Sequence, residues 1–281
     1  MPSFRFAICN EIYQGRPLAQ VCRDARALRY TGVELAPHTL AEDATQLTTG
    51  ERAIIRQQFS DAGVDFVGLH WLLVSPPDLH ITSQNPRVRR RSWDYVHRAI
   101  QLTADLALTN NDDRTVIVMG SPKQRSTRDG MTSQEGIAIW TEELSRAAPL
   151  AEASGVTLLI EPIPSAETNV VNTVAEAVAM VRNVGSPAVQ TMFDVHNAAD
   201  ETIPHESLLR TYAPYIRHIH VNESDGQEPG RGTYDFDALL RVLEELQYSG
   251  WVSVEAFDFT RPPEEVALRA INRLKSLSAG A

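Results

Sequence analysis

The feature that most constrains the fold is a regular alternation of strand-like and helix-like segments along the whole chain of 281 residues. Eight segments are apolar or β-branched enough to form strands, and stretches with helical periodicity separate them. Such alternation is typical of βαβ units, which build a parallel sheet. The expected strands are residues 4–12, 32–37, 64–73, 114–121, 155–163, 189–197, 216–224 and 251–259.

Local signals mark where the intervening helices begin and end. Three Thr-x-x-Glu patterns, at Thr48, Thr132 and Thr173, predict capping boxes. In a capping box the hydroxyl and the carboxylate satisfy amides of the first helical turn. Four glycines before expected strands predict helix ends, because glycine readily adopts the left-handed conformation that stops a helix. These glycines are Gly32, Gly63, Gly155 and Gly250.

Eight strand–helix units close naturally into an α/β fold of the (β/α)8 TIM barrel type. A doubly wound open sheet is the alternative, but it would carry a glycine-rich phosphate-binding turn after its first strand. Residues 8–15, ICNEIYQG, do not form such a turn. No linker interrupts the alternation, so we expect a single barrel domain over residues 1–281, with its functional site at the C-terminal ends of the strands.

Composition argues against several classes of function. The formal net charge of -10 and the pI near 5.3 disfavour non-specific binding to nucleic acid or anionic membranes. The basic run at residues 87–91 is expected to be the solvated face of a helix start. Cys9 and Cys22 give neither a disulfide framework nor a zinc motif. Because a signal peptide and a long apolar run are both missing, the sequence predicts a cytoplasmic protein.

Four consecutive expected strands end in an ionisable side chain, at intervals close to one strand–helix unit. These side chains should therefore lie at one level of the barrel mouth. Converging buried carboxylates repel one another, and a divalent cation resolves that repulsion. Oxygen ligands with one imidazole suit Mn²⁺ or Mg²⁺, with Co²⁺ and Zn²⁺ as alternatives. The four residues are Glu161, Asp194, His220 and Glu255.

Each member of this set also has an ordinary structural interpretation when it is taken alone. A single glutamate at a strand end is commonly a helix cap or an ion-pair partner. His220 alone would be read as a core histidine, and its neighbour His218 is expected to be one. It is the matching position on four neighbouring strands that favours a metal site.

Other polar residues at expected strand ends have two interpretations each. His70 and Trp71 follow the third strand, where they either bind substrate or pack in a lid. Lys123 and Arg125 follow a glycine turn, where they either hold an anionic substrate group or pair with acids of the mouth. Arg231 lies in a glycine- and proline-rich loop, and it has the same two interpretations.

Through the motifs LLIEPI, MFDVHN, HIHVNESDG and VSVEAF, the chain resembles the xylose isomerase-like TIM barrels of the sugar phosphate isomerase/epimerase superfamily. The resemblance covers nearly the whole chain. Members include ketose 3-epimerases, hydroxypyruvate isomerase, inosose dehydratase and, more distantly, endonuclease IV.

The resemblance implies a divalent-metal-dependent isomerase or epimerase of a sugar or sugar derivative. The alternative is a metal-dependent lyase that dehydrates a sugar or cyclitol. An endonuclease IV-like DNA repair protein is a third interpretation, which the acidic charge and the modest number of histidines oppose.

The resemblance also implies roles for the residues at the barrel mouth. One divalent metal ion, with Mn²⁺ as the first choice, would be bound by four of them. The two glutamates of this set would also act as acid and base through a cis-enediolate. The implied partner is a small-molecule sugar substrate, without nucleic acid or membrane, and relatives often form dimers or tetramers. The implied metal ligands are Glu161, Asp194, His220 and Glu255.

The match to the ketose 3-epimerases themselves is mixed. Glu167 corresponds to a glutamate that contacts substrate in those enzymes. Asn197 stands where they have a substrate-binding histidine, and His196, one residue early, is expected to point the other way. Gly226 replaces a further arginine. These departures weaken the match to ketose 3-epimerisation and leave the implied metal chemistry intact.

Overall fold

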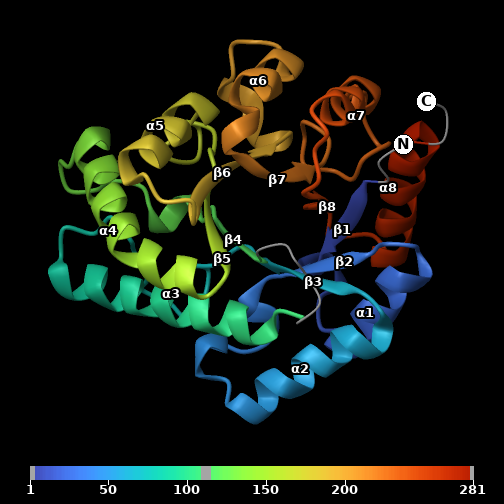
Figure 1. Ribbon diagram of the computed structural model, residues 1–281, viewed down its shortest axis with the longest axis horizontal. Helices are drawn as coiled ribbons and strands as arrows, with labels where there is room; N and C mark the ends of the chain where they lie inside the picture. The colour runs from blue at the N-terminus through green and yellow to red at the C-terminus, as the bar shows by residue number, and fades with distance from the viewer. Residues whose placement is uncertain (1–3, 109–114, 279–281) are drawn as a thin grey trace.

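The computed structural model describes residues 4–108 and 115–278, and in it eight parallel strands close into a barrel. Each strand pairs with the next along the chain, and β8 pairs with β1 to complete the ring (Figure 1). Every expected strand is confirmed. Each observed strand ends before the expected strand does, and the residues that follow it form the mouth of the barrel. The strands are β1 (Arg5–Cys9), β2 (Gly32–Leu35), β3 (Asp65–Leu69), β4 (Thr115–Met119), β5 (Val156–Ile160), β6 (Val189–Asp194), β7 (Ile216–Val221) and β8 (Trp251–Val254).

Helices surround the barrel on the outside (Figure 1). The three predicted capping boxes are confirmed at the starts of α2, α4 and α5. The basic run at residues 87–91 lies mostly exposed at the start of α3, as expected. None of the described helices is long and apolar enough to cross a membrane. The helices are α1 (Leu18–Ala27), α2 (Thr49–Ala62), α3 (Pro86–Leu106), α4 (Ser133–Ala153), α5 (Val174–Val184), α6 (His205–Tyr212), α7 (Phe236–Glu245) and α8 (Pro263–Ser278).

Two of the four predicted glycine helix ends are confirmed. Gly63 directly follows α2 and Gly155 follows α4 after one intervening residue, and both have φ of +68°. The prediction is wrong for Gly32 and Gly250, because α1 and α7 end several residues earlier. Gly32 serves packing instead, since a Cβ there would lie 2.7 Å from the ring of Trp251.

The interior of the barrel is layered. A separate cluster of buried apolar strand residues fills it, as expected for a barrel whose centre is a packed core rather than a pore. At the C-terminal ends of the strands, ionisable side chains replace the apolar ones in the interior of the barrel. The apolar layer therefore forms the floor of the site. The apolar cluster consists of Ala7, Val67, Val116, Val118, Leu159, Met192 and Trp251.

A β-bulge interrupts the pairing of β2 with β3. The register shifts after Val33, so that Glu34 faces Gly68 rather than Val67. A bulge of this kind redirects side chains next to functional sites. Gly68 permits the close approach of β4, because a Cβ at this position would lie 2.0 Å from the carbonyl oxygen of Val116.

We expect Gly68→Ala to lower the free energy of unfolding by about 2 kcal/mol, because the added methyl group must displace the β4 main chain. The measurement is urea denaturation of the wild type and the variant. Gly50→Ala is the matched control, since the nearest atom to its added Cβ, Thr48 Oγ1, is 4.0 Å away. Alanine at this helical position should leave stability unchanged or slightly raised. Equal effects of the two substitutions would contradict the close approach.

Candidate active site

The structure brings four ionisable residues together at the top of the barrel. One donor atom from each lies within 4.8 Å of the others, and none of the residues is more than 5% exposed. They come from the ends of four neighbouring strands, β5 to β8, as the spacing of the sequence requires. This group, called the four-residue cluster below, consists of Glu161, Asp194, His220 and Glu255.

His220 is at the centre of the four-residue cluster. Its Nδ1 atom lies 3.1 Å from Glu255 Oε2, 3.5 Å from Asp194 Oδ2 and 3.9 Å from Glu161 Oε1. The other ring nitrogen, Nε2, faces away and lies 3.2 Å from Glu34 Oε1. One imidazole nitrogen therefore points at three carboxylates, which is the arrangement of a mixed oxygen–nitrogen metal site.

The electrostatics of the four-residue cluster favour a bound cation. Burial, the charge of Glu255 and that of Asp194 raise the pKa of Glu161 to about 8. Burial likewise raises the pKa of Glu255. Burial disfavours the charged form of His220, but the charges of Glu34 and Glu255 outweigh it and place its pKa well above the ordinary value. Without a metal the cluster retains protons, and a divalent cation that displaces them fits this donor set.

Two asparagines hold the carboxylates in place. The main-chain N–H of Asn197 donates to Asp194 Oδ1 over 2.8 Å, and the side-chain amide of the same residue donates to Glu161 Oε1 over 3.1 Å. Asn222 Nδ2 lies 3.3 Å from Asp194 Oδ2. On the far side of Glu161 there is no room for a side chain, because a Cβ at Gly120 would lie 2.1 Å from Glu161 Oε2. The positions of both acids are thus fixed by neighbouring groups.

A cavity of about 510 Å³ opens above the four-residue cluster and reaches two of its members, Glu161 and Glu255. Its wall combines aromatic and polar side chains, as is typical of small-molecule sites. The other lining residues are Trp71, Val74, Ser121, Pro122, Lys123, Gln124, Ile163, Glu167, His196, Asn197 and Phe257.

Trp71 forms one aromatic wall of this cavity. Its ring stacks on Phe257, with centroids 6.1 Å apart, and on His38, with centroids 5.8 Å apart. Its backbone has φ of +48°, which is unusual for a residue other than glycine and is found at ligand-binding positions. The packing and the substrate interpretations of Trp71 are therefore compatible, since its packed side chain also lines the cavity.

Several residues singled out from the sequence line the cavity together. Lys123, Glu167 and Asn197 all do so. His196 also lines it, contrary to the expectation that it would point the other way. That expectation relied on strand geometry, but β6 ends at Asp194 and residues 196–200 form a 3-10 helix, in which neighbouring side chains no longer alternate.

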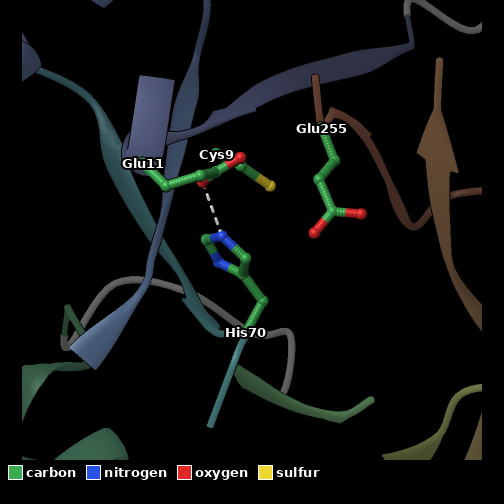
Figure 2. Close-up of side chains that lie close together, drawn as sticks. All are labelled: Cys9, Glu11, His70 and Glu255. Atoms are coloured by element: carbon green, nitrogen blue, oxygen red, sulfur yellow. Dashed lines mark hydrogen bonds and ion pairs between the residues drawn. The ribbon is translucent and has the colours of Figure 1, made fainter. Parts of the chain in front are cut away.

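His70 belongs to a second group of side chains, shown in Figure 2 with Cys9, Glu11 and Glu255. His70 Nε2 lies 2.6 Å from Glu11 Oε2, and both residues are buried. Burial raises the pKa of the Cys9 thiol to about 11. One donor atom from each of the four residues lies within 4.8 Å of the others, so Glu255 borders both groups. His70 is not part of the cavity wall, and substrate binding by it stays a prediction.

The structure places Arg125 away from the cavity, so nothing in it supports the predicted substrate role of this residue. The side chain is fully buried, and its guanidinium donates to the carbonyl oxygens of Met119, Glu161 and Val171. The chain turns back at Pro122–Gln124, so Arg125 points under the mouth and packs on the ring of Trp140. It supports the main chain of Glu161 and does not reach the cavity.

Arg231 is exposed and lies outside the cavity wall. Its Nε atom donates to Gln227 Oε1 over 3.1 Å within the β7–α7 loop. Glu223, which follows β7, orders the same loop by accepting from the amides of Gly230 and Tyr234. Nothing in this arrangement brings Arg231 to substrate, and its binding role stays a prediction.

Sequence reasoning assigned no role to three residues that the structure places at or beside the site. Glu34 contacts His220, Glu11 pairs with His70, and Phe257 stacks on Trp71. Glu11 does stand near the end of an expected strand, and Glu34 lies within another, which was an available signal. Their partners come from distant strands, and the sequence alone gives no indication of those pairings.

Comparisons with known proteins agree with this geometry. A family model described as xylose isomerase-like TIM barrel matches residues 22–277. The fructoselysine 3-epimerase of Escherichia coli O157:H7 is 26% identical over 277 residues, which cover 94% of this chain and 95% of that protein. The hydroxypyruvate isomerase of Escherichia coli K12 is 26% identical over 132 residues, 46% of this chain and 51% of that protein. A solved structure of an L-ribulose 3-epimerase superposes with a TM-score of 0.82 at 20% identity, covering 99% and 96% of the two chains.

We expect Glu161→Gln to stabilise the metal-free protein by about 1–3 kcal/mol at pH 7, because it removes a buried acid whose pKa is raised from 4.5 to about 8. Between these values the folded wild type keeps a proton that the unfolded chain has released. The free energy of unfolding of the wild type should therefore fall as pH rises from about 4.5 to about 8. The variant should not show this dependence on pH. Urea denaturation in EDTA measures both effects. A variant less stable than the wild type at pH 7 would contradict the proposed electrostatics.

Proposed function

The chain belongs to the xylose isomerase-like TIM barrel family, and from this premise we propose that it is a divalent-metal-dependent isomerase or epimerase of a sugar or sugar derivative. The feature that supports this activity most directly is the double position of Glu161 and Glu255. Both are donors of the four-residue cluster, and both line the cavity where a substrate would bind.

The metal site would be formed by the four-residue cluster, with Mn²⁺ as the first choice. Three carboxylates and one imidazole match the ligand preferences of Mn²⁺ and Mg²⁺, and Co²⁺ or Zn²⁺ would also suit them. A divalent cation held there supplies a Lewis acid, which lowers the pKa of a substrate C–H beside a carbonyl group and stabilises the resulting negative charge.

Proton transfer would be the work of the two glutamates. One removes the proton from the carbon next to the substrate carbonyl, giving a cis-enediolate, and the other returns a proton. Return to the opposite face of the same carbon inverts its configuration. Return to the former carbonyl carbon, together with passage of the hydroxyl proton to the former carbonyl oxygen, moves the carbonyl group. Glu161 and Glu255 are suited to this exchange by position, because both side chains border the cavity and proton transfer depends first on whether the group can reach the proton.

The surrounding residues would position the substrate. Asn197 holds Glu161 Oε1 and Asp194 Oδ1, so the carboxylates keep their orientation through the reaction. Trp71 lines the cavity, where the part of its aromatic side chain that borders the space can pack against a sugar. Lys123 and Glu167 lie at the open edge of the cavity, where they can meet substrate hydroxyl or anionic groups.

A ketose or ketose derivative is the first substrate to test, and the similarity to fructoselysine 3-epimerase supports this choice. That relative is named for inversion at carbon 3 of a ketose derivative. Carbon 3 is adjacent to the carbonyl carbon of such a ketose. Two flanking carboxylates can exchange the proton of a carbon in this position.

We expect the Mn²⁺-loaded protein to replace one substrate C–H by C–D in D₂O when it is offered a panel of ketoses, sugar phosphates and inososes. Glu161→Gln and Glu255→Gln should each lower this exchange by about 100-fold to 10,000-fold, because each removes one of the two proton-transferring groups. Proton NMR of the recovered sugars measures the exchange and identifies the product.

The control is Glu142→Gln, which changes an exposed glutamate of α4 that pairs only with Arg146 among the described residues. It should behave as the wild type. Full exchange in Glu161→Gln would contradict the assigned roles. If a substrate instead loses water irreversibly, and no deuterated sugar that is otherwise unchanged in composition is recovered, the protein is the dehydratase of the alternative interpretation.

A further inference from the structure

Glu34 is a buried carboxylate that the proposed reaction does not use. It lies on β2, is 0% exposed, and does not line the cavity above the four-residue cluster. A fully buried carboxylate is rare unless other groups satisfy it. Its role must therefore be sought in the residues that surround it.

Two histidines of β7 contact the same carboxylate. His218 Nε2 lies 2.8 Å from Glu34 Oε2, and His220 Nε2 lies 3.2 Å from Glu34 Oε1. Since an ionised carboxylate only accepts hydrogen bonds, both rings must present an Nε2–H group to it. His70, directly after β3, also approaches, with Nδ1 at 3.9 Å from Glu34 Oε1.

The hydrogen bond to Glu34 determines which nitrogen His220 offers to the cluster. When Nε2 carries the proton that is donated to Glu34, the Nδ1 lone pair of the neutral ring is available on the opposite side. That nitrogen is the one that lies 3.1 Å from Glu255 Oε2 and 3.5 Å from Asp194 Oδ2. In metal sites of known proteins, a carboxylate that accepts from the second ring nitrogen fixes the tautomer and orientation of the ligand.

We infer that Glu34 is a positioning residue of the metal site: it holds His220 with Nδ1 directed at the cation, and His218 holds Glu34. This inference rests on the proposed metal-dependent function. It assigns no contact with substrate to Glu34, because that side chain lies outside the cavity wall.

The backbone is shaped to place Glu34 there. The register shift after Val33 sets Glu34 opposite Gly68 on β3, and on its other side Glu34 pairs with Cys9 of β1. Without the bulge, Glu34 would face Val67, a residue of the apolar floor. The bulge thus separates the carboxylate from the apolar layer and brings it within hydrogen-bonding distance of His218 and His220.

The test compares Mn²⁺ binding by the wild type, Glu34→Gln and a matched control, using isothermal titration calorimetry on metal-free protein. The control is Glu228→Gln, which also removes the charge of a carboxylate that is 0% exposed. Glu228 pairs with Arg261 and Arg269 and contacts no member of the four-residue cluster. We expect the Mn²⁺ dissociation constant to rise about 10-fold to 100-fold in Glu34→Gln and to change less than twofold in the control.

A second measurement separates positioning from general stabilisation. In the Zn²⁺-loaded wild type, proton NMR should show the Nε2–H of His220 shifted downfield and protected from exchange by its bond to Glu34. This signal should disappear in Glu34→Gln. At saturating Mn²⁺ the variant should recover kcat to within about tenfold of the wild type, since only metal binding is impaired.

The outcomes distinguish this inference from the proposed function. A wild type that binds no divalent cation would overturn both. A wild type that binds Mn²⁺, with Glu34→Gln binding it equally well, would overturn the role of Glu34 alone, as would equal weakening in the Glu228→Gln control. If Glu34→Gln fails to fold, His218→Gln tests the same network, and unchanged Mn²⁺ affinity in that variant would overturn the inference.

Discussion

Three carboxylates crowd around one imidazole nitrogen at the buried top of the barrel, and their mutual repulsion is the constraint that the surrounding residues must satisfy. Two unit charges 4 Å apart interact by about 4 kcal/mol at an effective dielectric constant of 20. Three acids within 4.8 Å of one another therefore cannot all be ionised without compensation. Retained protons relieve the repulsion in the metal-free protein, and a divalent cation would relieve it in the active one.

The barrel makes this unfavourable arrangement tolerable because its strands are rigid and packed on both sides. The apolar floor beneath the cluster excludes water, and the main chain of Glu161 is fixed from below by Arg125. Glycines provide room where side chains would collide, as at Gly120 beside the Glu161 carboxylate. The closed sheet thus stabilises the fold and also holds mutually repelling carboxylates close together. Such a trade-off between the stability of a protein and the needs of its active site is common in enzymes.

Sequence reasoning predicted the fold and the four-residue cluster because both follow from periodicity. Strand–helix alternation repeats along the chain, and the strand ends of a barrel share one level, so Glu161 and Glu255 could be placed together without a structure. Arg125 and His196 were placed wrongly because their directions depend on short 3-10 turns beyond the strands, where the alternation of side chains no longer holds. The contacts of Glu34 depend on a bulge in β3 and on side chains of β7, and one sequence carries no signal for such tertiary pairing.

The central claim is that four strand ends form a single divalent-cation site. Anomalous diffraction from crystals soaked in Mn²⁺ tests it most directly. We expect one strong manganese peak within roughly 2.5 Å of a donor atom from each of Glu161, Asp194, His220 and Glu255. A peak coordinated instead by Cys9, Glu11 and His70, or the lack of any peak at the top of the barrel, would contradict it.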